Sequence, residues 1–144
     1  MILFFDTSVL VAGCVRRHPH FSRAHPLLRS VTRGEHEGVI SCHSLAETYS
    51  ALTSLPLQPR ISPADADAMI AGNFRQHFRL IPVTSAMYVR AVTACVQHSL
   101  PGGKVYDALL IECAREAACE RIYTFNTGDF QRIAPDLISR IAAP

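Results

Sequence analysis

The segment that most constrains the fold is the N-terminal run Ile2–Phe5, which is followed at once by Asp6. Four consecutive apolar residues, two of them aromatic, predict a strand that is buried on both faces. Such strands occur in parallel sheets covered by helices, and ligands bind in these folds just beyond the carboxyl ends of the strands. The sequence therefore predicts an α/β fold with Asp6 at the sheet edge where chemistry takes place.

The rest of the chain alternates between strand and helix patterns. Further strands are expected at residues 38–41, 80–83, 121–124 and 137–141, with helices at residues 7–17, 20–33, 43–55, 62–77, 84–98 and 105–119. No internal repeat or low-complexity tract interrupts this alternation. It predicts a single domain over residues 1–144, built as a three-layer α/β/α sandwich with a central parallel sheet.

Composition limits the classes of function. Hydrophobic residues make up 49% of the chain and charged residues 18%, which indicates a globular protein rather than a disordered one. The net charge of +2 does not by itself indicate a nucleic-acid partner, although arginines cluster between residues 16 and 33. No apolar run reaches the roughly 18 residues of a membrane span, and no signal-peptide pattern precedes the first strand. We therefore expect a cytoplasmic protein with no membrane partner.

The cysteines and histidines do not suggest a transition-metal site. The five cysteines form no C-x-x-C pair, which argues against both a disulfide framework and a zinc ribbon. His18, His20 and His25 lie close together in the sequence, but their spacing matches no standard metal motif. We expect these histidines to be exposed to solvent.

Asp107 is the acidic residue with the strongest individual signal. On a helix it shares one face with Leu110, Ile111 and Ala114, so its carboxylate would lie on a stripe that faces the core. Burying a carboxylate is costly unless a cation or hydrogen-bond donors compensate it. An acid in the first helical turn, facing the helix dipole, is the structural alternative. We favour a functional role.

Four other polar residues follow predicted strands or lie early in predicted helices: Asp6, Glu47, Asn126 and Asp129. Taken singly, each has a structural explanation, because Asp6 can cap a helix, Glu47 can be solvated, and Asn126 and Asp129 are typical of turns. The predicted fold, however, brings them to the same edge of the sheet as Asp107.

Carboxylate and amide oxygens are ligands for Mg²⁺ or Mn²⁺ rather than Zn²⁺. Because such ions complete their coordination with water and phosphate, the cluster predicts phosphodiester chemistry. We expect Asp6 and Asp107 to hold the ion directly or through water, while Glu47 with Asn126 or Asp129 orients water molecules. Ser8 argues against a haloacid-dehalogenase phosphatase, which needs a second aspartate at that position.

Four motifs carry a family resemblance: residues 4–10, residues 40–47, residues 102–110 and residues 123–130. In this order and spacing they resemble the motifs of PIN-domain ribonucleases and, more narrowly, of the VapC toxins of bacterial toxin–antitoxin pairs. The resemblance covers essentially the whole chain. It implies a metal-dependent endoribonuclease that hydrolyses RNA, is inhibited by a VapB-like antitoxin and forms a homodimer.

Asp6, Glu47 and Asp107 match the three acidic positions of the family, whereas Asn126 stands at a fourth position that is usually acidic. This difference supports a second hypothesis, a PIN-like module that binds RNA or protein without hydrolysis. Retained binding of Mg²⁺ or Mn²⁺ would argue against that module, and RNA binding insensitive to chelators would argue for it.

Overall fold

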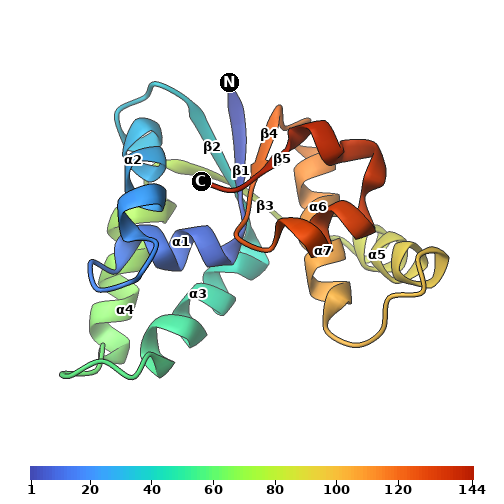
Figure 1. The fold of residues 1–144 in the computed structure, drawn as a ribbon. Helices are drawn as coiled ribbons and strands as arrows, with labels where there is room; N and C mark the ends of the chain where they lie inside the picture. The colour runs from blue at the N-terminus through green and yellow to red at the C-terminus, as the bar shows by residue number, and fades with distance from the viewer.

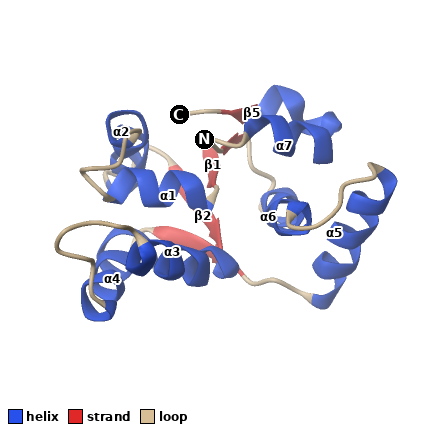
Figure 2. Cartoon of the chain, turned by 60° about the horizontal axis from the view of Figure 1, so that its bottom comes forward, coloured by secondary structure: helices blue, strands red, loops and turns tan.

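The computed structural model describes residues 1–144 and contains a five-stranded parallel sheet with the strand order β3-β2-β1-β4-β5. Its strands are β1 (Ile2–Phe5), β2 (Glu37–Ser41), β3 (Phe78–Ile81), β4 (Arg121–Tyr123) and β5 (Ile141–Ala142). Helices α1 (Thr7–Cys14), α2 (Phe21–Thr32), α3 (Cys42–Ser54) and α4 (Pro63–Ile70) cover one face, and α5 (Ser85–Gln97), α6 (Lys104–Glu116) and α7 (Thr127–Ile133) cover the other (Figures 1 and 2). The predicted three-layer α/β/α sandwich is confirmed.

The central strand β1 divides the core into two layers. Leu3 and Phe5 pack with the side chains of α1 to α4, whereas Phe4 packs with those of α5 to α7. All three side chains are at most 1% exposed, as expected for a parallel strand between two layers of helices. This burial holds the end of β1, and therefore Asp6, in the middle of the sheet edge.

Hydroxyl side chains fix the starts of three helices. Ser41 accepts a hydrogen bond from the backbone N–H of His43, Ser62 from that of Asp65, and Thr84 from that of Met87. The first of these caps matters most for the site, because α3 begins at the residue after β2 without an intervening loop.

Several predicted boundaries differ from the structure. Helix α1 ends at Cys14 rather than near residue 17, and the helix capped by Ser62 ends at Ile70 and continues as one π-helical turn, Ala71–Arg75. Strand β3 begins two residues before the predicted segment at residue 80, ends at Ile81 directly before Pro82, and lies at the sheet edge. No helix is both long and apolar enough to cross a bilayer.

The predicted fifth strand is present, but its bounds of residues 137–141 are wrong. Residues Pro135–Arg140 form a 3₁₀ helix, and β5 consists only of Ile141–Ala142. Pro135 starts the 3₁₀ helix, since its fixed φ suits a first helical position. Helix α7 was also not predicted, because Asn126, Thr127 and Gly128 together are typical of a turn.

Gly38 offers a test of how closely α2 and β3 pack on β2. A Cβ atom at this position would lie 2.6 Å from the Phe78 ring and 2.6 Å from Cγ1 of Val31. We expect Gly38→Ala to lower the free energy of unfolding by about 1–3 kcal/mol, since the buried neighbours must shift. Chemical denaturation measures this change. Gly72→Ala is the matched control, because nothing lies within 4 Å of its Cβ position, and equal stability of the two variants would contradict the prediction.

Candidate active site

The predicted site residues lie at the carboxyl edge of the sheet. Asp6 directly follows β1, Glu47 lies in α3 after β2, and Asn126 follows β4 immediately before α7. Asp107 comes from the opposite layer, in the first turn of α6. The charge of Asp6 raises the pKa of both Glu47 and Asp107, so the structure brings these three carboxylates together.

Asp6 occupies the N-cap position of α1, but its side chain makes no capping hydrogen bond. Instead, Oδ2 of Asp6 accepts hydrogen bonds from the hydroxyls of Ser8, at 2.6 Å, and Thr124, at 2.7 Å. The residue is only 6% exposed. Its second oxygen, Oδ1, has no hydrogen-bond partner and is not sealed from solvent. The structural explanation of Asp6 as a helix cap is therefore wrong.

Glu47 is held by two neighbours through one oxygen. The Thr7 hydroxyl donates to Oε1 at 3.3 Å, and Nε2 of His43 lies 3.5 Å from the same atom, which leaves Oε2 without a partner. Burial raises the pKa of Glu47, His43 opposes this effect, and the charge of Asp6 adds to it. His43 was missed in the sequence, although its spacing of four residues from Glu47 places both on one helical face.

Asp107 is the most perturbed of the three carboxyls. Burial, followed by the charges of Asp6 and Asp129, raises its pKa from 3.8 to about 6, although Lys104 opposes this. The amide of Asn126 donates to Oδ2 at 3.0 Å, whereas Oδ1 has no partner. Asp107 thus lies both in the first helical turn and within a cluster of like charges, so the two explanations from the sequence apply together.

Asp129 differs from the other acids because cations occupy both of its oxygens. Lys104 donates to Oδ2 at 2.5 Å, and Arg132 pairs with Oδ1. Hydrogen bonds from Lys104 and from Asn126 lower the pKa of Asp129 to about 2. Asp129 therefore lies next to the cluster without adding a free carboxylate oxygen to it.

The free oxygens fit a hard divalent cation. Asp6, Glu47 and Asp107 each keep one carboxylate oxygen without a partner, and burial together with the charge of Asp6 raises the pKa of Glu47 and of Asp107. No three acidic, histidine or cysteine side chains converge as a ready-made metal site. An ion held by few protein oxygens and several waters, as Mg²⁺ commonly is, matches this donor set.

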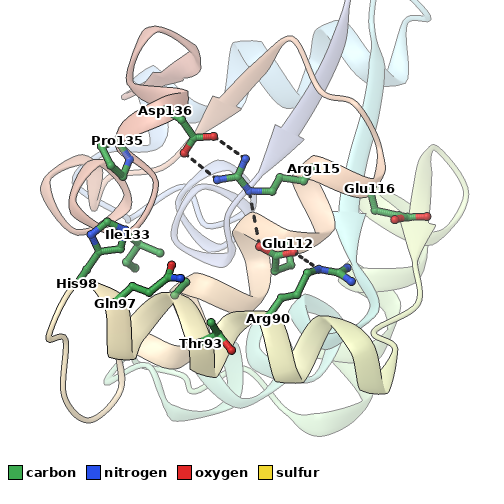
Figure 3. Close-up of a pocket in the computed structure, with 11 residues that line it drawn as sticks. Arg90, Thr93, Gln97, His98, Glu112, Arg115, Glu116, Ile133, Pro135 and Asp136 are labelled. Carbon is green, nitrogen blue, oxygen red and sulfur yellow. Dashed lines mark hydrogen bonds and ion pairs between the residues drawn. The ribbon is translucent and has the colours of Figure 1, made fainter.

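The largest cleft lies elsewhere, between α5, α6 and the 3₁₀ helix, and has a volume of about 570 Å³ (Figure 3). Its buried acid, Glu112, bonds Arg90 at 2.7 Å and lies 3.6 Å from Arg115, which also forms two hydrogen bonds to Asp136. These charges neutralise one another. The buried carboxylate of this cleft is therefore part of a structural ion-pair network, and the remaining acid in its lining, Glu116, has no carboxylate partner beside it like those around Asp6.

The raised pKa of Asp107 has a consequence for stability. In the folded state its carboxyl stays protonated up to about pH 6, whereas in the unfolded chain it ionises near 3.8, so stability falls as pH rises through this window. We expect Asp107→Asn to raise the free energy of unfolding at pH 7.5 by about 1–2 kcal/mol, allowing for solvent screening, with no gain near pH 3. Denaturation in the presence of a chelator tests this, and an equal gain at both pH values would contradict it.

Comparisons with known proteins agree with this geometry. The sequence matches the PIN domain over residues 3–135. It is 35% identical to Ribonuclease VapC40 and 36% identical to Ribonuclease VapC27, both of Mycobacterium tuberculosis. The aligned region covers 80% of this chain in the first comparison and 82% in the second, and 80% of each relative.

Solved structures show the same fold. VapC20 of M. tuberculosis, described as a toxin that cleaves the sarcin–ricin loop, superposes with a TM-score of 0.70 at 24% identity, covering 90% of this chain and 92% of its own. VapBC2 of Rickettsia felis, bound to a DNA fragment from its promoter, gives a TM-score of 0.70 at 20% identity. The superposition covers 99% of this chain and 98% of the VapBC2 chain. This chain belongs to the PIN-domain family.

Proposed function

We propose that this protein is a metal-dependent endoribonuclease of the VapC type and acts as the toxin of a VapBC-type toxin–antitoxin pair in the cytoplasm. The observation that carries the proposal is the set of three carboxylates, each with one unpartnered oxygen, at the carboxyl edge of the sheet. The ribonuclease relatives at 35% and 36% identity support RNA as the substrate.

Asp6 and Asp107 are the residues that would hold Mg²⁺ or Mn²⁺, through Oδ1 of each. A divalent cation at this position supplies positive charge at the scissile phosphate and acidifies the attacking water. Glu47, which lies in α3, accepts a proton from the attacking water or orients that water. The Lys104 ammonium, held by Asp129, adds a fixed positive charge near Asp107 for the phosphate backbone.

The polar neighbours of these acids act as positioning residues. Ser8 and Thr124 hold Oδ2 of Asp6 and leave Oδ1 without a partner. Asn126 does the same for Asp107 through its amide group. An amide can fill this role because it donates a hydrogen bond to Asp107, and in the absence of a cation it adds no negative charge beside it. Asn126 is therefore compatible with hydrolysis, which favours the nuclease over the binding module.

The nuclease proposal predicts dependence on both metal and Asp6. We expect Asp6→Asn to lower the rate of RNA cleavage by at least about 100-fold, because loss of even an outer-shell partner typically costs 10–100-fold in metal affinity or activity. Cleavage of a mixed structured RNA with Mg²⁺, Mn²⁺ or a chelator measures this. Asp67→Asn, at an exposed site on α4, is the matched control. Chelator-insensitive RNA binding without any cleavage would instead support the binding module.

The exposed face of α5 supports a homodimer. Tyr88, Val89, Val92 and Val96 are 50%, 66%, 53% and 74% exposed, respectively, and form one apolar stripe on this helix. We infer that a second copy of the chain covers this stripe. Solved neighbours include VapBC complexes from Rickettsia felis and Haemophilus influenzae, which supports a VapB-like antitoxin as a further partner.

We expect Val96→Lys to convert the dimer to a monomer, because a charge buried in an apolar interface loses its hydration without gaining a partner. Light scattering coupled to size-exclusion chromatography measures the molecular mass. Gln97→Lys is the control, since this exposed neighbour lies on another side of the same helix. A monomeric wild-type protein, or dimers for both variants, would contradict this interface.

A further inference from the structure

A second cleft lies directly beside the acidic cluster. It has a volume of about 500 Å³, within the roughly 300–1,000 Å³ typical of ligand pockets. Its walls come from α1, from the connection between α1 and α2, and from the segment after β4; the lining includes Thr7, Ser8, Val11, His18, His20 and Phe125. Thr7 and Ser8 also bond the carboxylates of Glu47 and Asp6, so the cleft and the cluster share one boundary.

One wall of the cleft consists of stacked rings. The imidazole of His20 lies on the Phe125 ring, with centroids 4.5 Å apart and planes inclined by 20°. The guanidinium carbon of Arg23 lies 5.5 Å from the centre of the same phenyl ring. The rings of His20 and Phe125 are half-buried, and so is His18. The expectation that His18 and His20 are exposed to solvent is therefore wrong. A flat aromatic surface with an adjacent cation is a common platform for an unpaired nucleobase.

Hydrogen bonds connect this platform to the acidic cluster. The backbone N–H of Phe125 donates to the Ser8 hydroxyl at 3.2 Å, and the same hydroxyl donates to Asp6 at 2.6 Å. A base on the platform would therefore belong to a nucleotide next to the phosphate at the cluster. These two short contacts fix the position of the Phe125 backbone relative to the Asp6 carboxylate.

His18 supplies a directional polar group in the cleft. Its Nδ1 accepts a hydrogen bond from the backbone N–H of His20 at 3.1 Å, which requires the tautomer with the proton on Nε2. Burial and the neighbouring His20 lower the pKa of His18, which keeps this neutral form at pH 7. The Nε2–H group can then donate to an acceptor on a base edge.

The charges around the cleft suit a polyanion. Arg16, Arg17 and Arg23 are exposed, and none of them pairs with a carboxylate. Arg17 and Arg23 each donate one hydrogen bond to a backbone carbonyl, of Gln58 and Pro144 respectively, and keep their remaining donors. These guanidinium groups can bind the phosphates that flank a base in the cleft.

We propose that this cleft is a nucleobase subsite, in which His20 and Phe125 stack an unpaired RNA base next to the scissile phosphate and His18 contacts its edge. This subsite rests on the proposed nuclease function, and it would select the RNA substrate by the base beside the cleaved phosphate. RNA fits better than a protein side chain because the cleft combines a flat ring pair, unpaired guanidinium groups and contact with the acidic cluster.

The first test measures RNA affinity in the Asp107→Asn background, which prevents turnover, by fluorescence anisotropy with a labelled pool of single-stranded RNA. We expect His20→Ala and Phe125→Leu to weaken binding about fivefold or more, as loss of base–aromatic stacking does. His20→Phe keeps a ring and retains affinity. His98→Ala, at an exposed site in the other cleft, is the matched control. Because His20 lies in a helix connection, its variants keep the test valid even if Phe125→Leu does not fold.

The second test maps cleavage sites by sequencing RNA 5′ ends after digestion with the wild-type protein and with His20→Ala. We expect one position beside the cut to lose its base preference in His20→Ala but not in His98→Ala. Unchanged affinity and unchanged preference would overturn the subsite, leave the nuclease intact and point to a protein occupant. Weakened binding without cleavage by the wild type would support the subsite but overturn the nuclease. No RNA binding by any variant would overturn both.

Discussion

Repulsion between partly buried carboxylates is the constraint on which the candidate site depends. Asp6, Glu47 and Asp107 come from three separate helices or helix starts, and the fold brings them into one region where water only partly screens their charges. Burial, together with this repulsion, raises the pKa of Asp107 to about 6. A site of this kind lowers stability in exchange for function, and the surrounding structure must hold it in place.

The scaffold meets this requirement with rigid elements and short polar contacts. Asp6 follows a strand whose side chains are almost fully buried, and Glu47 lies on a helix that starts without a loop after β2. Each acid is then held through one oxygen only, by hydroxyls at Asp6, by a hydroxyl and the His43 imidazole at Glu47, and by an amide at Asp107. Neutral donors of this type fix a carboxylate without cancelling its charge, whereas the paired cations at Asp129 do cancel it.

The sequence predicts the layers of the fold and the convergence of the acids, because both follow from strand ends in a parallel sheet. The continuous apolar run of β1 and the hydroxyl residues that cap helices, Ser41, Ser62 and Thr84, are local features of the chain. The absence of a cap at Asp6 is not visible, since it depends on Thr124, which is 118 residues away. Helix α7 is hidden for a similar reason: residues 126–128 have turn propensities that tertiary packing of Phe130 and Ile133 overrides.

The aromatic cleft shows the same limit. His18 and His20 belong to no recognisable sequence motif. Their surroundings arise only when the α1–α2 connection packs against Phe125. Burial of a histidine next to a distant aromatic ring is a tertiary property. The acids were predicted because strand ends are topologically fixed, whereas the cleft depends on how a connection folds.

Phe125 stands between Thr124, which holds Asp6, and Asn126, which holds Asp107. This tripeptide therefore allows side-chain replacement but not a change of length, since one inserted residue would move both acids out of register. The α1–α2 connection, residues 15–20, carries the other half of the cleft and none of the acids. We therefore expect two kinds of change to be tolerated in this part of the molecule: residue exchange at position 125, and variation in the length and composition of the connection opposite it.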